Sequence, residues 1–302
     1  MDRRTLLTAL PAAGFLSVSG SGARAAHLSA ETIRGRVDGA DVSLYVRDWG
    51  SGSPILFLSA WGFPSDSWQY QMLPLHRQGF RCVAYDRRGH GRSTDPGGGY
   101  DYDTLADDLS HVLEALDLRD VTLVAYSMGS GEAVRYITRH GRGRIARILF
   151  LAPTTPFLLR TADNPQGVDA AALAAGRAGI AEDFPGGLSS GFDRFLDGGV
   201  SEELKGWAKT LMLQCSLKAL TDCQEAMTST DFRAELRNLR LPTLVIHGDS
   251  DRSAPPALTG LRTAALVPGA EFRSYAGAPH GLVFTHMARL AADIAAFATR
   301  SG

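Results

Sequence analysis

The chain has 302 residues, a formal net charge of -1 and a hydrophobic content of 44%. Nearly balanced charge offers no electrostatic attraction for nucleic acid or for an anionic membrane surface, so the expected partner is a small molecule. The length suffices for one large hydrophobic core, with or without an inserted lid.

The first residues predict an export signal and not part of a folded domain. Arg3 and Arg4 precede a mildly apolar stretch, 5–20, which a proline and a glycine interrupt. A bilayer-spanning helix needs about 20 uninterrupted apolar residues, so no stable membrane insertion is expected after cleavage. Residues 23–25 read Ala-Arg-Ala, a typical cleavage signal. We predict a twin-arginine signal peptide, 1–25, and a periplasmic or secreted mature protein; a retained anchor or a disordered tail stays open as the alternative.

The mature chain, 26–302, begins with two extended segments, 32–37 and 42–47, which Asp38-Gly39 separates. This dipeptide is a hairpin signal and predicts an antiparallel edge. Further strands are predicted at 55–58, 81–85, 121–125, 147–151, 243–247 and 271–275. The helices predicted between and after them span 67–78, 105–117, 132–140 and 284–297. Strands that alternate with helices predict an α/β fold, with a mostly parallel sheet and helices on both faces.

One stretch departs from this alternation. Residues 153–238 are about twice as long as a single crossover, are rich in Gly and Ala, and contain separate helix candidates at 202–213 and 217–227. We interpret the stretch as a helical cap inserted over the sheet rather than a second autonomous domain.

The three cysteines, Cys82, Cys215 and Cys223, cannot all pair, and none has metal-ligand spacing with a histidine. If one helix carried both Cys215 and Cys223, they would be about 12 Å apart, too far for a disulfide. We therefore expect reduced, mostly buried thiols and no metal site. A disulfide in the cap stays open for the case that this region is not helical.

The residues Ala125-Tyr126-Ser127-Met128-Gly129 join a predicted strand to a predicted helix. Small residues at both ends of such a turn let the two backbones approach closely, which lifts the serine Oγ above the sheet. The pattern indicates a nucleophile elbow. A small-x-Ser-x-Gly string also arises by chance. Whether Ser127 is a nucleophile therefore depends on finding a suitable base and acid elsewhere in the sequence.

Two more reactive side chains follow predicted strand ends, Asp251 after 243–247 and His280 after 271–275. Because the carboxyl ends of parallel strands meet at one edge of a sheet, both are expected near Ser127. A serine needs a base to take its proton, and a histidine base needs a carboxylate to hold its tautomer. The chain order Ser, Asp, His is the one used on such sheets. We predict Ser127 as nucleophile, His280 as base and Asp251 as the orienting acid.

Asp249 competes with Asp251 for this role; we favour Asp251 and interpret Asp249 as a turn or capping residue. His247 ends a predicted buried strand and is interpreted as a structural histidine. The Arg87-Arg88 pair is interpreted as a tie within its loop. Five further histidines are expected to be solvent-facing or structural: His76, His90, His111, His140 and His286.

Several runs carry a family resemblance: LSAWGFPSDSWQYQM, YDRRGHGRS, GYDYDTLADDL, YSMGSGEAVRYI, LVIHGDSD and GAPHG, with DNPQG and TDFR in the cap. They resemble the α/β-hydrolase family, in particular its small bacterial aryl esterases and cofactor-free haloperoxidase-like perhydrolases. The resemblance extends over nearly the whole mature chain and implies the α/β-hydrolase fold. By position it implies the same three catalytic residues, and an oxyanion hole formed by the backbone N–H groups of Trp61 and Met128.

Two departures from the family pattern matter. Ser59-Ala60 stands where relatives usually carry His-Gly. If that glycine position requires a positive φ, Ala60 would cost about 1–2 kcal/mol there, and the Trp61 N–H could be displaced. Ala125 replaces the usual first glycine of the elbow, which is tolerable if the facing helix presents the small residues 129–131.

The sequence therefore predicts a secreted serine hydrolase that cleaves small carboxylic esters or lactones through an acyl-enzyme, with a perhydrolase variant when hydrogen peroxide replaces water. The triad needs no metal or organic cofactor. A serine at the elbow argues against haloalkane dehalogenases and epoxide hydrolases, which resemble this fold but use Asp there. The altered oxyanion loop keeps a second hypothesis open, a ligand-binding protein of this fold with negligible hydrolysis.

The sequence motifs do not determine the acyl or alcohol group of the substrate or the preferred enantiomer. They also do not determine the balance of esterase and perhydrolase activity or the oligomeric state. Aromatic residues of the cap and of the loops near it are candidates for an apolar pocket wall. These are Trp61, Trp68, Phe157, Phe184, Phe192 and Trp207.

Overall fold

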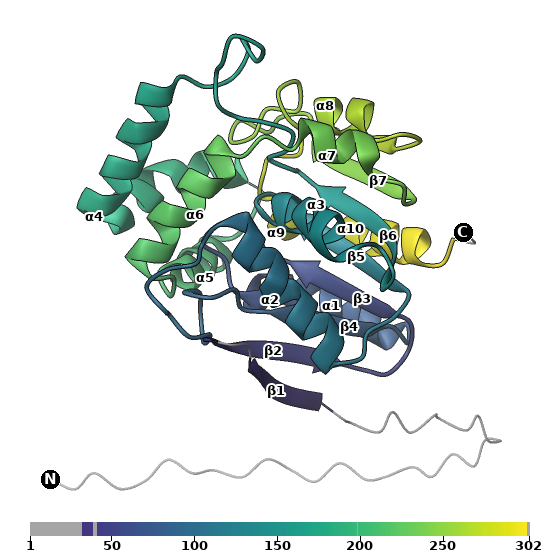
Figure 1. Ribbon diagram of the computed structural model, residues 1–302. Helices are drawn as coiled ribbons and strands as arrows, with labels where there is room; N and C mark the ends of the chain where they lie inside the picture. Colours follow the sequence, from purple (N-terminus) through teal and green to yellow (C-terminus); the bar gives the residue numbers. More distant parts are fainter. Residues whose placement is uncertain (1–31, 39–40, 198, 301–302) are drawn as a thin grey trace, which may run out of the picture. The chain divides into compact units, whose positions relative to one another are not determined.

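The computed structural model of the protein describes residues 32–38, 41–197 and 199–300. The predicted signal peptide lies outside these ranges. Within them the chain forms one eight-stranded sheet in the order β1-β2-β4-β3-β5-β6-β7-β8 (Figure 1). The strands are β1 (Thr32–Asp38), β2 (Ser43–Trp49), β3 (Pro54–Leu58), β4 (Arg81–Tyr85), β5 (Val121–Tyr126), β6 (Ile145–Leu151), β7 (Thr243–Gly248) and β8 (Glu271–Tyr275).

Two antiparallel pairings, β1 with β2 and β2 with β4, form the N-terminal edge of the sheet. All pairings from β4 through β3, β5, β6 and β7 to β8 are parallel. Strands β5 and β7 are buried at every position, as expected for central strands of a parallel sheet that is covered on both faces. The predicted fold class and its antiparallel edge are confirmed.

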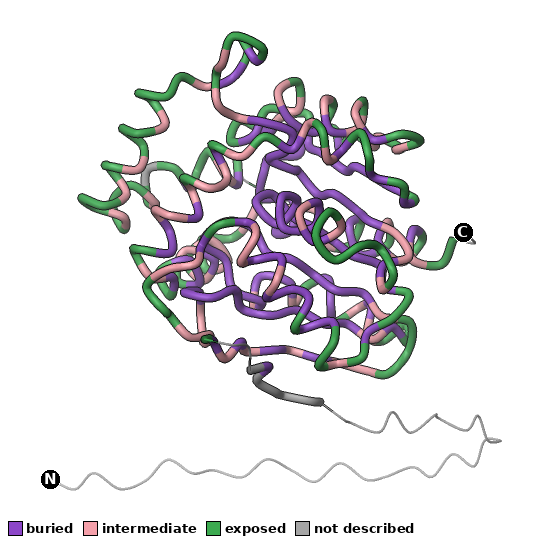
Figure 2. The backbone as a smooth tube through the Cα atoms, viewed as in Figure 1, coloured by how far each residue is buried: buried purple, intermediate pink, exposed green. Residues whose placement is uncertain are grey.

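Helices cover both faces of the sheet, and the interior between them is buried (Figure 2). One face carries the 3-10 turn η1 (Ser65–Trp68) with helices α1 (Gln69–Arg77), α9 (Leu282–Thr285) and α10 (Met287–Ala298). The other face carries α2 (Tyr102–Ala115), α3 (Gly129–His140), α7 (Arg233–Asn238) and α8 (Gly260–Leu266).

Two predicted helices are divided in the structure. The segment predicted at 67–78 begins as the 3-10 turn and becomes regular only at Gln69, although Pro74 lies inside α1. The last predicted helix is divided into α9 and α10 at His286, whose φ of -126° and ψ of 36° are not helical, although its N–H still donates to the Leu282 carbonyl at 2.9 Å.

The cap consists mainly of helices α4 (Ala170–Leu196), α5 (Glu202–Met212) and α6 (Leu217–Ser229), which gather at one side of the sheet (Figure 1). Helix α4 is kinked at Asp183, whose φ of -149° is not helical. The Asp183 carboxylate accepts a hydrogen bond of 3.0 Å from the Gly186 N–H, which caps the second half of the helix. Although α4 has 27 residues, no helix in the described ranges is long and apolar enough to cross a bilayer.

The cysteines are free thiols. Cys215 and Cys223 do not share one helix, because α5 ends at Met212 and α6 begins at Leu217, so Cys215 lies between the helices. Burial raises the pKa of Cys82 and of Cys223 to about 12. The expectation of reduced, buried thiols is confirmed, and their raised pKa values make them poor nucleophiles.

Helix α3 lies unusually close to its neighbours because its first turn contains glycines. A Cβ added at Gly129 would lie 2.8 Å from the Cβ of Leu58, and one added at Gly131 would lie 2.4 Å from Cζ of Tyr102. The Tyr102 ring cannot move away easily, since its hydroxyl donates to the Met128 carbonyl at 3.1 Å and it packs in a T-shaped arrangement on Phe232, with the ring centroids 5.0 Å apart. These glycines fix the distance between the start of α3 and the sheet.

This close contact leads to a stability prediction. We expect Gly131→Ala to lower the free energy of unfolding by about 1–3 kcal/mol, because the added methyl group overpacks a rigid contact. Gly143→Ala is the matched control, since a Cβ there meets no atom within 4 Å and a change within about 0.5 kcal/mol is expected. Urea unfolding measures both, and equal stabilities of the two variants would contradict the prediction.

Candidate active site

Ser127 stands at the carboxyl end of β5 in a strained backbone conformation. Its φ is 54°, in the left-handed region that costs a residue with a Cβ about 1–2 kcal/mol. Backbone hydrogen bonds hold this conformation, because the Ser127 N–H donates to the Leu151 carbonyl at 2.9 Å and the Ser127 carbonyl accepts from the Ser130 N–H at 3.0 Å. The Ser130 hydroxyl donates to the same carbonyl at 2.6 Å. The turn therefore presents the serine side chain above the edge of the sheet.

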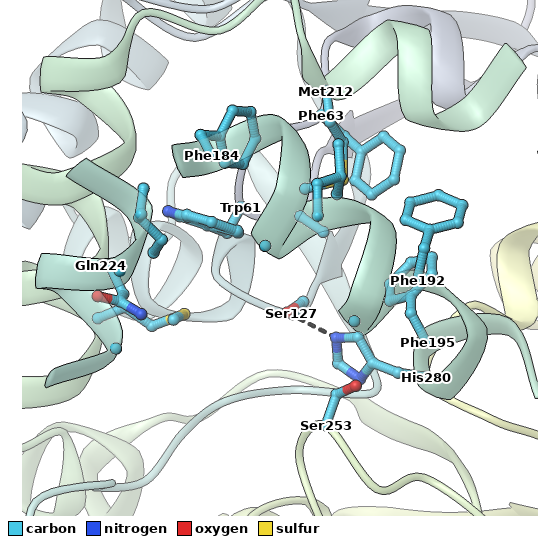
Figure 3. A pocket seen from close by; sticks show the side chains of 18 of the residues that line it. Trp61, Phe63, Ser127, Phe184, Phe192, Phe195, Met212, Gln224, Ser253 and His280 are labelled. Atoms are coloured by element: carbon cyan, nitrogen blue, oxygen red, sulfur yellow. Dashed lines mark hydrogen bonds between the residues drawn. The ribbon is translucent and has the colours of Figure 1, made fainter. Parts of the chain in front are cut away.

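The structure brings the three predicted catalytic residues together. Oγ of Ser127 lies 2.9 Å from Nε2 of His280 (Figure 3). Nδ1 of the same ring lies 2.6 Å from Oδ2 of Asp251. All three residues are buried, so the chain of hydrogen bonds is largely shielded from bulk water. A neutral His280 with its proton on Nδ1 leaves Nε2 free to accept the serine proton.

Asp251 is held by four donors. The backbone N–H groups of Ser253 and Ala254 both donate to Oδ1 at 2.8 Å. Oδ2 lies 2.6 Å from His280 Nδ1 and 2.9 Å from His247 Nε2. Burial acts to raise the pKa of Asp251, but the charge interaction with His280 and the hydrogen bonds from His247, His280 and Ala254 outweigh burial and hold this pKa well below its usual range. The carboxylate is therefore ionised at neutral pH.

Asp249, the competing carboxylate, is exposed and accepts a hydrogen bond of 2.7 Å from the Gly277 N–H. It ties the loop after β7 to the loop after β8 and does not contact His280. The interpretation of Asp249 as a turn residue is confirmed.

The sequence analysis did not predict a role for His247 in the site. We expect a structural histidine there, and it is fully buried at the end of β7. Its Nε2, however, contacts the carboxylate that orients His280. The signal was present in the spacing, because His247 and Asp251 are four residues apart across a tight turn at a strand end.

The Arg87-Arg88 pair ties its loop, as expected, and reaches the candidate oxyanion loop. Arg87 forms two hydrogen bonds with the Glu132 carboxylate, at 2.8 and 2.7 Å, and donates to the Ser59 carbonyl at 2.9 Å. Burial acts to lower the pKa of Arg87, but the charge and hydrogen bonds of Glu132 outweigh burial and raise it. Arg88 forms a second buried pair, with Asp108.

Ala60 carries none of the strain that a positive φ would cause. The non-glycine residues with positive φ in the described ranges include Ser127 and Ala152, but not Ala60. The backbone N–H groups of Trp61 and Met128 donate to no acceptor among the hydrogen bonds of the described residues. The Trp61 side chain is anchored separately, by a hydrogen bond of 2.8 Å from Nε1 to the Leu220 carbonyl in the cap.

Ser127 and His280 open into a cavity of about 680 Å³ between the sheet edge and the cap. Its walls are mostly apolar and include Phe63, Phe195 and Met212 (Figure 3). Of the six aromatic candidates, Trp61, Phe184 and Phe192 line the cavity, whereas Trp68, Phe157 and Trp207 do not. Trp68 is instead core, with its ring 4.9 Å from that of Phe57. A site of this volume and polarity suits a neutral small molecule.

Elsewhere in the described ranges, no group of three or more His, Cys, Asp or Glu side chains is placed to hold a metal ion. Among the histidines, His90 is buried with Nδ1 2.9 Å from the Arg88 carbonyl. Burial lowers the pKa of His90 to about 3, so this ring is neutral and structural.

A strand, a sharp turn with a buried serine and a helix meet at the carboxyl edge of the parallel sheet, and comparison with known families identifies the class of protein that has this arrangement. The family model described as the alpha/beta hydrolase fold matches residues 53–287. The chain belongs to this family, and its class is that of a hydrolase. The family expected from the sequence motifs is confirmed.

The chain is also similar to individual members of the family over most of its length. The chain is 38% identical over 246 residues to the non-heme chloroperoxidase CPO-A1 of Kitasatospora aureofaciens, which covers 80% of this chain and 90% of the relative. It is 34% identical over 271 residues to the bifunctional esterase/perhydrolase DCH of Acinetobacter calcoaceticus, covering 86% and 96%. A bromoperoxidase from Bacillus anthracis has a TM-score of 0.84 at 34% identity, with 89% of this chain and 100% of that chain covered.

The lowered pKa of Asp251 predicts how the free energy of unfolding depends on pH. A carboxylate with a lower pKa in the folded state than in the unfolded chain, where it is about 3.9, stabilises the fold above that pH. We expect the excess stability of the wild type over Asp251→Asn to be full above about pH 5 and to shrink as the pH falls below about 4. Urea unfolding from pH 7 to pH 3 measures this; a constant difference over the whole range would contradict it.

Proposed function

We propose that the protein is a serine hydrolase that cleaves small carboxylic esters or lactones through an acyl-enzyme on Ser127, with perhydrolase activity when hydrogen peroxide is present. The observation that carries the proposal is the hydrogen-bond chain from Ser127 through His280 to Asp251 at the wall of an apolar cavity. The similarity to a bifunctional esterase/perhydrolase supports it independently.

Acylation begins when the ester carbonyl lies next to Ser127 Oγ. His280 Nε2 takes the hydroxyl proton as Oγ attacks the acyl carbon, and Asp251 stabilises the imidazolium that forms. The backbone N–H groups of Trp61 and Met128 are proposed to stabilise the negative charge on the carbonyl oxygen, a role for which their lack of internal acceptors suits them. His280 then protonates the leaving alcohol as its bond to the acyl carbon breaks.

Deacylation repeats these steps with a small nucleophile. His280 removes a proton from water, the resulting attack breaks the bond to Ser127 Oγ, and the serine regains its proton as the acid leaves. When hydrogen peroxide attacks instead of water, the same bond breaks and the product is a peracid. A cavity lined mainly by apolar side chains keeps the concentration of competing water low near the acyl group.

The size of the cavity bears on the substrate class. A volume of about 680 Å³ lies within the range of sites that enclose drug-sized ligands. Aromatic residues such as Phe184 and Phe192 supply much of the wall. The proposed substrates are therefore neutral esters or lactones with an apolar acyl or alcohol group.

The nucleophile can be tested directly. We expect a fluorophosphonate probe to add once to the wild type, as seen by intact mass, and not to Ser127→Ala, because the Ser127 hydroxyl lies 2.9 Å from the His280 nitrogen that would take its proton. Turnover of an aryl ester by Ser127→Ala should fall on the order of 10,000-fold or more. Ser229→Ala, at an exposed position of α6, is the control and should retain both labelling and turnover.

The same experiment decides the alternative function. Labelling of Ser127 without turnover of any ester would favour a ligand-binding protein of this fold. Absence of labelling on well-folded protein would mean that Ser127 is not activated, which would overturn the proposed mechanism. Ester turnover at ordinary enzyme rates would exclude the binding-protein alternative.

We also propose export by the twin-arginine route, supported by Arg3-Arg4 and by the Ala-x-Ala sequence that ends at Ala25. In a host with this route, the exported protein should have the mass of a chain that begins at Ala26. Arg3→Lys with Arg4→Lys should keep the precursor inside the cell without changing its charge. Unchanged export of this double variant would contradict the proposal.

A further inference from the structure

His247 is placed where a second imidazole can act on the catalytic carboxylate. Its ring is fully buried at the end of β7. Nε2 lies between two oxygens, 2.9 Å from Oδ2 of Asp251 and 3.0 Å from the Ala254 carbonyl. Nδ1, at the other side of the ring, has no hydrogen-bond partner among the described residues.

These contacts determine the protonation state of the ring. Two acceptors around Nε2 require that this nitrogen carries the proton, because an unprotonated Nε2 would face two lone pairs. Nδ1 meets helix α8 at Gly260, where even a Cβ would lie only 2.2 Å from it. A proton on Nδ1 would be a buried donor without an acceptor, which is more costly than an unpaired lone pair. The ring is thus neutral, with its proton on Nε2.

We propose that His247 is a positioning residue for the hydrolase reaction, which holds Oδ2 of Asp251 in place and reduces the negative charge that this oxygen presents to His280. The inference rests on the proposed function, since it concerns the same site. It adds a fourth side chain to the Ser127, His280 and Asp251 arrangement.

The physical reason is that two imidazoles share one carboxylate oxygen. Oδ2 accepts from His280 at 2.6 Å and from His247 at 2.9 Å, while Oδ1 is satisfied by the backbone of the loop. Each donor that withdraws charge from the carboxylate weakens its attraction for a proton on His280. His247 therefore reduces the negative charge that Asp251 presents to His280, which favours the neutral base over the imidazolium.

Other ionisable groups near this carboxylate do not replace His247. The Tyr126 hydroxyl donates to the His280 carbonyl at 2.9 Å and not to Asp251. Asp249 and Arg252, its neighbours in the loop, are exposed, and Arg252 pairs with Asp197. From α8 the residue that meets the ring is Gly260, which has no side chain. His247 is thus the one uncharged donor besides His280 on Oδ2 within the described residues.

The test compares two substitutions at this position. His247→Gln keeps an N–H donor near the place of Nε2, whereas His247→Leu fills similar space without a donor. We expect the acid limb of the kcat/KM profile to move to higher pH by about 0.5–1 unit in His247→Leu. It should return to within about 0.2 unit of the wild type in His247→Gln. His90→Gln, which alters another buried, neutral histidine, is the control and should leave this limb unchanged.

A second readout does not depend on turnover. ¹⁵N NMR of histidine-labelled protein should show His247 as the neutral tautomer with its proton on Nε2 from pH 5 to pH 8. The same spectra titrate His280 directly, and its pKa should rise in His247→Leu by the amount that the kinetic limb moves. If His247→Leu does not fold, the tautomer in the wild type and the titration in His247→Gln still test the proposal.

The results that would overturn the inference are distinct. A proton on Nδ1 of His247, an unchanged His280 pKa in His247→Leu, or an equal shift in the Gln and Leu variants would each show that donation to Asp251 does not set the basicity of His280. Absence of ester turnover by the wild type would instead count against the proposed function, because the NMR titration of His280 would still report on His247.

Discussion

A buried carboxylate that remains ionised is the constraint around which the site is built. Burying a lone charge is costly unless hydrogen bonds replace the lost water. Asp251 meets this requirement with two backbone N–H groups on one oxygen and two imidazoles on the other. This arrangement fixes the orientation of His280, and the position of His280 in turn determines which proton it can take from Ser127.

The second constraint is the close approach of α3 to the sheet. Ser127 reaches the edge only because its backbone adopts a positive φ, and the turn around it tolerates this strain because its carbonyl and N–H are hydrogen bonded. Gly129 and Gly131 let the helix begin immediately beside Leu58 and Tyr102. Ala125, at the start of the elbow, is fully buried near the end of β5.

The cap determines which molecules can reach Ser127. Helix α4 bends at Asp183, and residues on both sides of this bend line the cavity above Ser127. Trp61 connects the two parts of the site, since its backbone belongs to the loop after β3 and its indole donates to the cap at Leu220. Arg87 braces the same loop through Ser59. A change in the cap can therefore affect both the cavity and the candidate oxyanion loop.

Much of this architecture follows from the sequence alone. Apolar runs and helical spacing predict the alternating strands and helices, because a parallel sheet needs strands that are apolar on both faces. The elbow and the order Ser127, Asp251, His280 place three reactive groups at strand ends, where a parallel sheet brings them to one edge. The helix prediction was less accurate where local geometry interrupts a periodic pattern: the helix at 284–297 is divided at His286, and the kinked helix α4 was not among the predicted helices.

Only the tertiary structure decided which groups touch. The spacing of four residues places His247 near Asp251, but only the folded loops show that His247 donates to Asp251 while Asp249 ties two loops together. Sequence spacing also could not tell that Ala60 avoids a positive φ, or which aromatic residues face the cavity. These properties depend on how separate segments pack in three dimensions, whereas the fold class depends on local periodicity that each segment carries by itself.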